Sequence, residues 1–114
     1  MLIRFTYTDK WEDVWFRKLP PTTKLLYLYI LDRCDIAGIW EVDLELAAFT
    51  IGADIGAIQG AYDGLKDKYK PIADNKIWLI NFLRRQKNEP LNPANAAHAV
   101  IINRLILYYQ IPEI

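Results

Sequence analysis

The segment TTKLLYLYILDR, residues 22–33, constrains the fold of this chain more than any other. Its apolar residues lie on nearly every side of a helix, which is typical of a central helix that other elements cover on several faces. Pro21 suits the first position of this helix, where its missing N–H group leaves no hydrogen bond unmade. We therefore expect a central helix over 21–33, with the rest of the chain packed around it.

A strand and a short helix are expected next along the chain. Gly38 stops the central helix, and GIWEV, residues 38–42, has the composition of a short strand. Asp43 suits the N-cap of a helix over 44–51, and Gly52 suits its end.

A second short helix is expected over 55–69, after a tight turn. Asp54 suits its N-cap. Its apolar residues recur at helical spacing and form one face, which must meet the core. They are Ile55, Ile58, Tyr62, Leu65 and Tyr69.

A β-hairpin is expected over 70–82, where apolar runs flank the pair Asp74-Asn75. Such a pair between two apolar runs is typical of a tight hairpin turn. The second strand, over 76–82, is the stronger of the two.

Helices are also expected near both ends of the chain. Asp9 and Glu12 have the spacing of a capping box for a short helix over about 10–18. A final helix, ANAAHAVIINRLILYYQ, is expected over about 94–110 after a polar stretch.

This order of elements predicts an α+β fold, mainly α, of the winged helix-turn-helix type with a small three-stranded antiparallel sheet. The two short helices form the helix-turn-helix, the hairpin forms the wing, and the strand at 38–42 pairs with the wing. Three strands and a helical face make a stable unit, whereas an isolated hairpin does not. We expect a single domain over 1–114, with a core over about 1–92 and an additional C-terminal helix over 93–110.

Three stretches carry a resemblance to a known family: WFRKLPPTTKLLYLYIL, AGIWEVDLELAAFTIG and KIWLINFLRRQKNEPLNPANA. Together they resemble the N-terminal domain of phage and prophage replication proteins of the DnaD-like, replisome-organiser type. The resemblance covers nearly all of the chain. It departs at Pro20, where a serine-like cap is common, and at the glycine-rich helix.

The resemblance implies a function in starting phage DNA replication or in controlling phage genes. Its motifs are mostly core positions, so it indicates the fold more specifically than the activity. Proteins of this type usually carry a second domain that recruits the helicase machinery. We therefore expect this chain to be the N-terminal part of a longer protein, with replication proteins as partners of that other domain.

The composition favours a binding protein over an enzyme, and we expect no catalytic residue, metal or cofactor. The chain lacks serine, which excludes serine-based triads. Cys34 falls late in a buried helix and is expected to be structural, and His98, the single histidine, has too few companions for a zinc site. No apolar run has the length of a signal peptide core or a membrane span, so we expect a cytoplasmic protein with no membrane contact.

The outward face of the second short helix has an unusual composition for a DNA-reading helix. Gly56, Gly60 and Gly64 fall opposite the apolar stripe, with Asp63 and Asp67 beside them, and Gln59 is the one side chain there suited to reading bases. Glycine lowers helix stability by about 1 kcal/mol relative to alanine. Either these glycines let a partner helix or a DNA strand approach closely, or an exposed helix simply tolerates them.

Basic residues gather after this helix and are expected to form one edge, together with Arg104, that contacts DNA phosphates. The formal net charge is zero, so any DNA affinity should be modest and salt-dependent. A merely solvated set of charges remains an equal alternative. The expected DNA-binding residues are Gln59, Lys66, Lys68, Lys70, Lys76, Arg84, Arg85 and Lys87.

The chain is rich in aromatic residues, with four Trp and seven Tyr, and some of them are expected in an interface. Two hypotheses follow. The first is a DNA-binding winged-helix domain for duplex DNA, and the second is a protein-interaction module on the same fold that forms a homodimer or higher oligomer. The expected interface residues are Gly56, Gly60, Gly64, Trp11, Trp15, Tyr108 and Tyr109.

Overall fold

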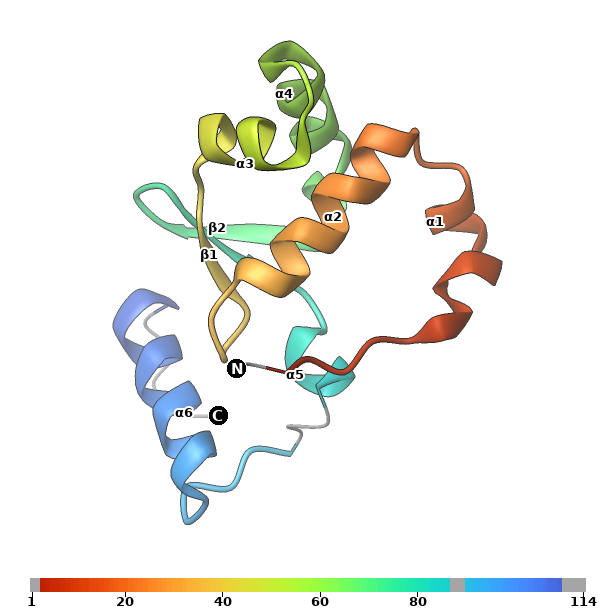
Figure 1. The fold of residues 1–114 in the computed structure, drawn as a ribbon. Helices are drawn as coiled ribbons and strands as arrows, with labels where there is room; N and C mark the ends of the chain where they lie inside the picture. The colour runs from red at the N-terminus through yellow and green to blue at the C-terminus, as the bar shows by residue number, and fades with distance from the viewer. Residues whose placement is uncertain (1–2, 87–89, 110–114) are drawn as a thin grey trace.

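The central helix is present where the sequence predicts it. In the computed structural model, which describes residues 3–86 and 90–109, helix α2 spans Pro21–Arg33 with Pro21 at its first position. Leu26 and Ile30 are almost completely buried, and helices α3 and α4 pack against α2 (Figure 1). The burial is less complete than the composition suggests, because Leu25 is 52% exposed.

The helix-turn-helix also begins and turns at the predicted residues. Helix α3 spans Leu44–Ile51, and the Asp43 carboxylate accepts a hydrogen bond from the Leu46 N–H at 3.0 Å. Gly52 ends it with φ of +83°, a left-handed conformation that glycine adopts without steric cost. Asp54 caps helix α4, Ile55–Gly64, through the Ala57 N–H at 3.4 Å.

Helix α4 ends five residues earlier than predicted. It stops at Gly64, and a 3₁₀ turn, η2, follows over Lys66–Lys68. Tyr69, which the helical spacing placed on the α4 stripe, instead begins a strand and stacks on Tyr62 with ring centroids 4.9 Å apart. Pairing in the sheet therefore overrides helical spacing at this residue.

The sheet has three antiparallel strands in the order β1-β3-β2, as in a winged helix. Strand β1 is Ile39–Glu41, β2 is Tyr69–Ala73 and β3 is Lys76–Leu79. The β2–β3 turn has Asn75 at φ of 60°, which confirms the predicted hairpin. The mainly α, α+β winged-helix-like class is thus confirmed.

Strand β3 ends three residues before the predicted position. Asn81 has a φ of 67° and starts the short helix α5, Phe82–Arg85, so the predicted strand over 76–82 was too long. Phe82 is buried directly against Gly38, where an added Cβ would lie 2.8 Å from the Phe82 side chain. Burial of Phe82 against Gly38 explains why the chain leaves the sheet after Leu79 and turns toward the core.

The N-terminal segment differs from the predicted helix over 10–18. It forms a 3₁₀ helix, η1, over Thr8–Glu12 and a four-residue helix, α1, over Val14–Arg17. Asp9 does not cap it. The Asp13 carboxylate instead caps α1 by accepting a hydrogen bond from the Trp15 N–H at 3.0 Å. The segment is therefore divided at Asp13 into two short helices.

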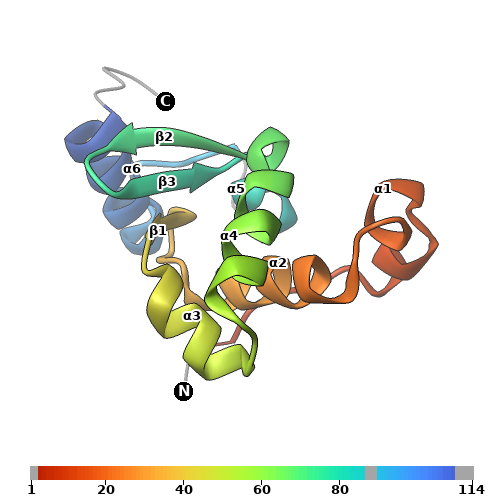
Figure 2. The ribbon, with the colours of Figure 1, turned by 90° about the horizontal axis from the view of Figure 1, so that it is seen from above.

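The C-terminal helix α6 spans Ala96–Tyr109 and lies beside the sheet on the side of β2 (Figure 2). The Asn95 side chain accepts hydrogen bonds from two N–H groups of its first turn, so the helix begins two residues later than predicted. Ile101 and Leu105 are almost fully buried, so α6 is part of the core cluster.

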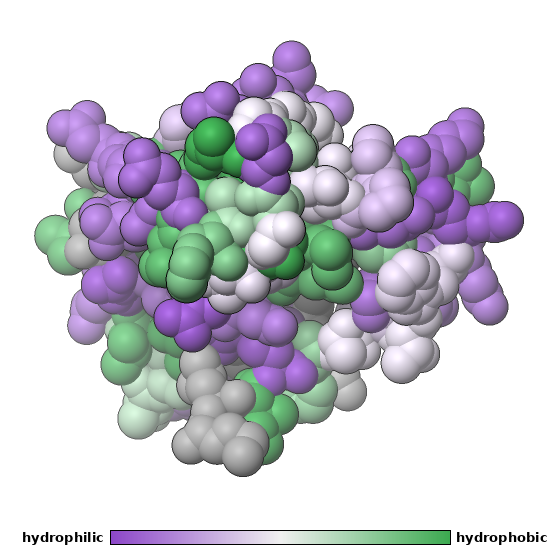
Figure 3. Space-filling model, turned by 45° about the horizontal axis from the view of Figure 1, so that its top comes forward, coloured by the Kyte–Doolittle hydropathy of each residue, from purple (hydrophilic) through white to green (hydrophobic). Residues whose placement is uncertain are grey.

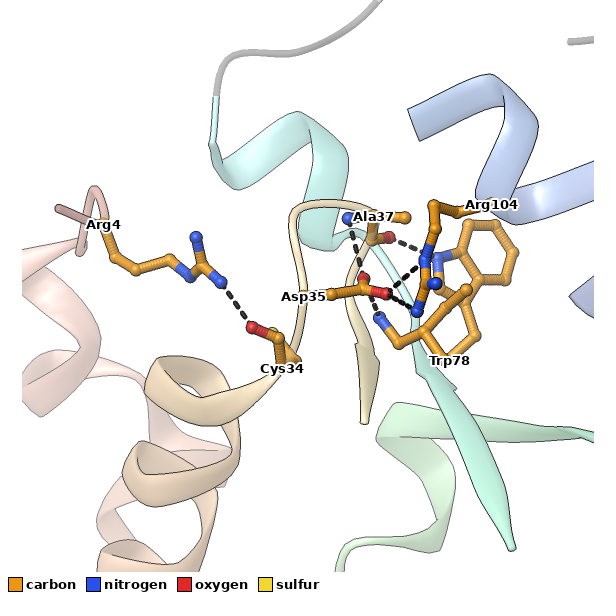
Figure 4. A network of polar contacts seen from close by, with 7 residues as sticks. Arg4, Cys34, Asp35, Ala37, Trp78 and Arg104 are labelled. Atoms are coloured by element: carbon orange, nitrogen blue, oxygen red, sulfur yellow. Dashed lines mark hydrogen bonds and ion pairs between the residues drawn. The ribbon is translucent and has the colours of Figure 1, made fainter. Parts of the chain in front are cut away.

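Two consecutive residues at the corner between α2 and β1, Cys34 and Asp35, bind side chains from the N-terminal segment and from α6 (Figure 4). The Arg4 guanidinium donates to the backbone oxygen of Cys34. The next residue, Asp35, forms an ion pair with Arg104 of α6 at 2.6 Å and accepts N–H groups of the β1 turn. The Trp78 indole N–H donates to the Ala37 oxygen at 2.9 Å and fixes that turn to β3.

Candidate DNA- and protein-binding surfaces

The outward side of α4 is open to solvent. Gly56, Gly60 and Gly64 are all exposed, and a Cβ built on Gly60 would meet nothing within 4 Å. At Gly64 the nearest atom is a Thr23 methyl at 4.0 Å. Packing within the domain therefore does not explain glycine at Gly60 or Gly64.

The charge of the helix-turn-helix is entirely negative. Between residues 43 and 64 the chain has four carboxylates and no lysine, arginine or histidine. Asp63 is exposed on the outward side of α4, and so is Gln59. A recognition helix that enters the major groove normally presents Arg, Lys, Asn or Gln to the bases, and here Gln59 alone fits that pattern.

Large apolar side chains are exposed on the same two helices. Phe49 is 85% exposed, Leu46 is 50% exposed and Ile55 is 40% exposed. We call the exposed residues of α3 and α4 together the α3–α4 face. Figure 3 turns this end of the molecule forward and shows green and white surface through its middle with purple side chains around it.

Sequence reasoning missed the apolar residues of α3, and it placed Ile55 in the core. A signal was present in LELAAFTI, because six of its eight residues are apolar and a helix can bury only one side. The structure buries Ala47 and Ala48, the small residues, and leaves Phe49 outside.

Basic residues follow α4 on the segments that begin and follow the wing. Lys66, Lys70 and Arg84 are exposed, and the Ile80 N–H donates to the Lys68 oxygen at 2.9 Å, which brings the turn before α5 beside η2. The Lys68 ammonium lies 4.2 Å from the centre of the Trp15 ring, a cation–π contact that ties η2 to α1. We call Lys66, Lys68, Lys70 and Arg84 the wing base.

The expected single basic edge is divided in the structure. Lys76 lies at the opposite end of β3, across from Glu41 in the register of the sheet and about 13 Å from Ile80 at about 3.3 Å per residue. Arg104 lies at the α2–β1 corner in its ion pair with Asp35. The Arg85 side chain and Lys87 lie outside the described part of the chain.

The aromatic residues expected in an interface differ in how far they are exposed to solvent. Trp11 is 54% exposed, with its edge against Phe16 at 5.0 Å between centroids. Trp15 packs against Tyr27 at 5.2 Å and carries Lys68 on its face, so its main contacts lie within the domain. The side chains of Tyr108 and Tyr109 lie outside the described structure.

Two titratable side chains, Cys34 and Tyr62, have a raised pKa. Burial raises the pKa of the Cys34 thiol to about 12, so the thiolate is not formed near neutral pH. Burial and the hydrogen bond with Tyr69 raise the pKa of Tyr62 above its usual value. Among the residues that the structure describes, no group of three or more His, Cys, Asp or Glu side chains is placed to hold a metal ion.

A cavity of about 600 Å³ lies between the N-terminal segment and α2, where Tyr7, Trp11, Tyr27 and Leu31 line it. It contains none of the residues of the α3–α4 face or of the wing base. Over residues 3–86 and 90–109, no helix has both the length and the apolar character needed to span a membrane.

Comparisons with known proteins return no match of this chain to a family model, a curated protein or a solved structure.

Proposed function

We propose that this domain binds duplex DNA through the wing base, as part of a phage-type protein that initiates or regulates DNA replication. The observation that supports the proposal is that Lys66, Lys70 and Arg84 are exposed on the segments that begin and follow the wing of a winged-helix fold. The resemblance of three sequence stretches to phage and prophage replication proteins supports the biological setting.

The chemistry of this surface suits phosphates rather than bases. Lysine and arginine neutralise phosphate charge without reading sequence, whereas α4 offers only Gln59 for base contacts. Asp67 lies among the wing-base residues and reduces their field. We therefore expect modest affinity, weak sequence preference and a log-affinity that falls with log salt at a slope of roughly −3 for three phosphate contacts.

The test is a titration of labelled duplex DNA by fluorescence anisotropy at several salt concentrations. The double variant Lys70→Ala with Arg84→Ala should weaken binding roughly tenfold and make the salt slope shallower by about 2. Arg33→Ala is the control, because Arg33 is exposed at the far end of α2, about 15 Å from Thr23 at the end near α4. Equal effects of the control and the single variant Arg84→Ala, or no duplex binding by the parent chain at low salt, would contradict the proposal.

A protein-interaction function is the second candidate, and one observation favours it. The α3–α4 face combines exposed apolar side chains with carboxylates only, which repel phosphate. The two functions use different surfaces, so one does not exclude the other.

A further inference from the structure

We propose that the α3–α4 face is a docking site for a basic amphipathic helix of a partner protein. The partner helix would match the α3–α4 face in two ways. Its apolar side would contact the apolar residues of the face, and its basic residues would lie near the carboxylates. The inference goes beyond DNA binding at the wing base and does not depend on it.

The apolar part of the site is built from both helices. Phe49 and Leu46 are exposed on α3, and three residues separate the end of α3 from Ile55, the first residue of α4. Single exposed apolar residues are ordinary on protein surfaces, but several on two consecutive helices form a patch of the kind that partners cover.

The charges of the face identify the chemistry of the partner. Glu45 and Asp63 are exposed, and Asp43 and Asp54 are exposed carboxylates that each cap a helix. No cation offsets them within residues 43–64. Complementary potentials steer association and like charges oppose it, so a lysine- or arginine-bearing segment is favoured.

The same charges argue against a second copy of this face as the partner. A two-fold symmetric contact places each patch against its own copy. Such a contact would bring the carboxylates of one α3–α4 face against those of the other. Duplex DNA is disfavoured for the same reason, since its surface is a regular array of phosphates.

The shape of the face admits a helix. Gly60 has nothing within 4 Å of its missing Cβ, so a partner backbone can approach α4 more closely there than at a residue with a side chain. Next to Leu46, an open depression of about 570 Å³ extends past Tyr29 and Val42. Arg33 and Glu41 also line this depression.

The probe is a labelled synthetic helix of about 18 residues, with leucine on one face and lysine on the other. Its matched control has glutamate in place of every lysine. Fluorescence anisotropy with the full 114-residue chain should show binding of the lysine peptide at least tenfold tighter than of the glutamate peptide. Backbone amide shifts in NMR spectra should be largest in α3 and α4.

Two variants should weaken the lysine peptide. Phe49→Ser should reduce its affinity at least tenfold, and Asp63→Lys should reduce it several-fold. Leu107→Ser is the matched control, because Leu107 is 66% exposed on α6, away from this face, and it should leave affinity unchanged. Circular dichroism confirms that each variant is folded.

Three outcomes would overturn the inference. The first is equal affinity of the Phe49→Ser and Leu107→Ser variants for the lysine peptide. The second is amide shifts that map to α6 or the N-terminal segment. The third is a dimer of the parent chain in sedimentation that Phe49→Ser dissociates, which would assign the face to a second copy. None of these results bears on duplex binding at the wing base, so the two proposals fail separately.

Discussion

The helix-turn-helix and the segment that follows it are neighbours with opposite charge. Residues 43–64 have four acidic and no basic residues, whereas residues 65–85 have six basic and two acidic residues. The formal net charge of the whole chain is zero. The comparison shows that a net charge of zero arises here from two neighbouring regions of opposite charge.

The two regions differ in apolar exposure as well. The α3–α4 face exposes Leu46, Phe49 and Ile55, whereas within residues 65–85 the exposed large apolar residue is Ile80, at 36%. A phosphate-binding surface needs charge and little apolar contact, and a protein-docking surface needs an apolar centre. Each region therefore has the composition that suits one of the two proposed functions.

The largest expected effect is the difference in the free energy of unfolding between a substitution on the buried side of the helix-turn-helix and one on its exposed side. Ile58 is 0% exposed between α4 and α2, so Ile58→Ala should lower the free energy of unfolding by about 2–5 kcal/mol, through lost burial and a cavity. Phe49→Ala should change it by less than about 0.5 kcal/mol, because the ring is already in solvent. Urea unfolding followed by tryptophan fluorescence measures both. A Phe49 variant as unstable as the Ile58 variant would mean that the exposed ring is part of the core.

A smaller effect of opposite sign is expected at two glycines. Gly60→Ala should raise the free energy of unfolding by up to about 1 kcal/mol, because alanine favours helix and meets no neighbour there. Gly52→Ala should lower it by about 1 kcal/mol, because φ of +83° is strained for any residue with a Cβ. Thermal unfolding of the two variants measures whether each substitution raises or lowers the free energy of unfolding. A loss of stability at Gly60 would show that its missing side chain is needed within the domain, and would weaken its assignment to the docking site.

The smallest effect tests whether α4 approaches DNA. Asp63→Lys reverses a charge on the outward side of α4 but leaves the wing base intact. If DNA contacts the wing base and does not touch α4, duplex affinity at physiological salt should rise by less than about threefold, because an exposed lysine that touches no phosphate adds little binding free energy in water. Anisotropy titration measures the change. An increase of tenfold or more would place α4 in the groove and remove the contrast between the two surfaces.

Local signals predicted most of the fold. Pro21, Asp43 and Gly52 mark helix boundaries by their own chemistry, and the structure has boundaries at each of them. The hairpin turn likewise needed only Asp74 and Asn75. These features depend on a few adjacent residues, so they can be read from the chain alone.

Features that depend on tertiary contacts were predicted poorly. Helix α4 stops at Gly64 because Tyr69 is needed in the sheet, and β3 stops at Leu79 because Phe82 must be buried against Gly38. Helical spacing extended the first element too far, and apolar composition extended the second.

The candidate sites divide in the same way. The charge and glycine pattern of α4 was evident in the sequence, and the structure places those residues outward as expected. The single basic edge was not found, since residues close in sequence occupy opposite ends of β3 and Arg104 pairs with Asp35. Exposure of Phe49 depends on which side of α3 meets α2, which single-sequence periodicity left open.

The corner between α2 and β1 has a consequence for how mechanical load passes through the domain. Arg4 is held at Cys34 and Arg104 is held at Asp35, so the N-terminal segment and α6 are fastened to consecutive residues. Tension applied at either segment therefore reaches Cys34 and Asp35, and it passes to the sheet through the hydrogen bonds between Asp35 and Ile39 and through the Trp78 indole. Pulling on one terminal segment should loosen the other before it disturbs the helix-turn-helix.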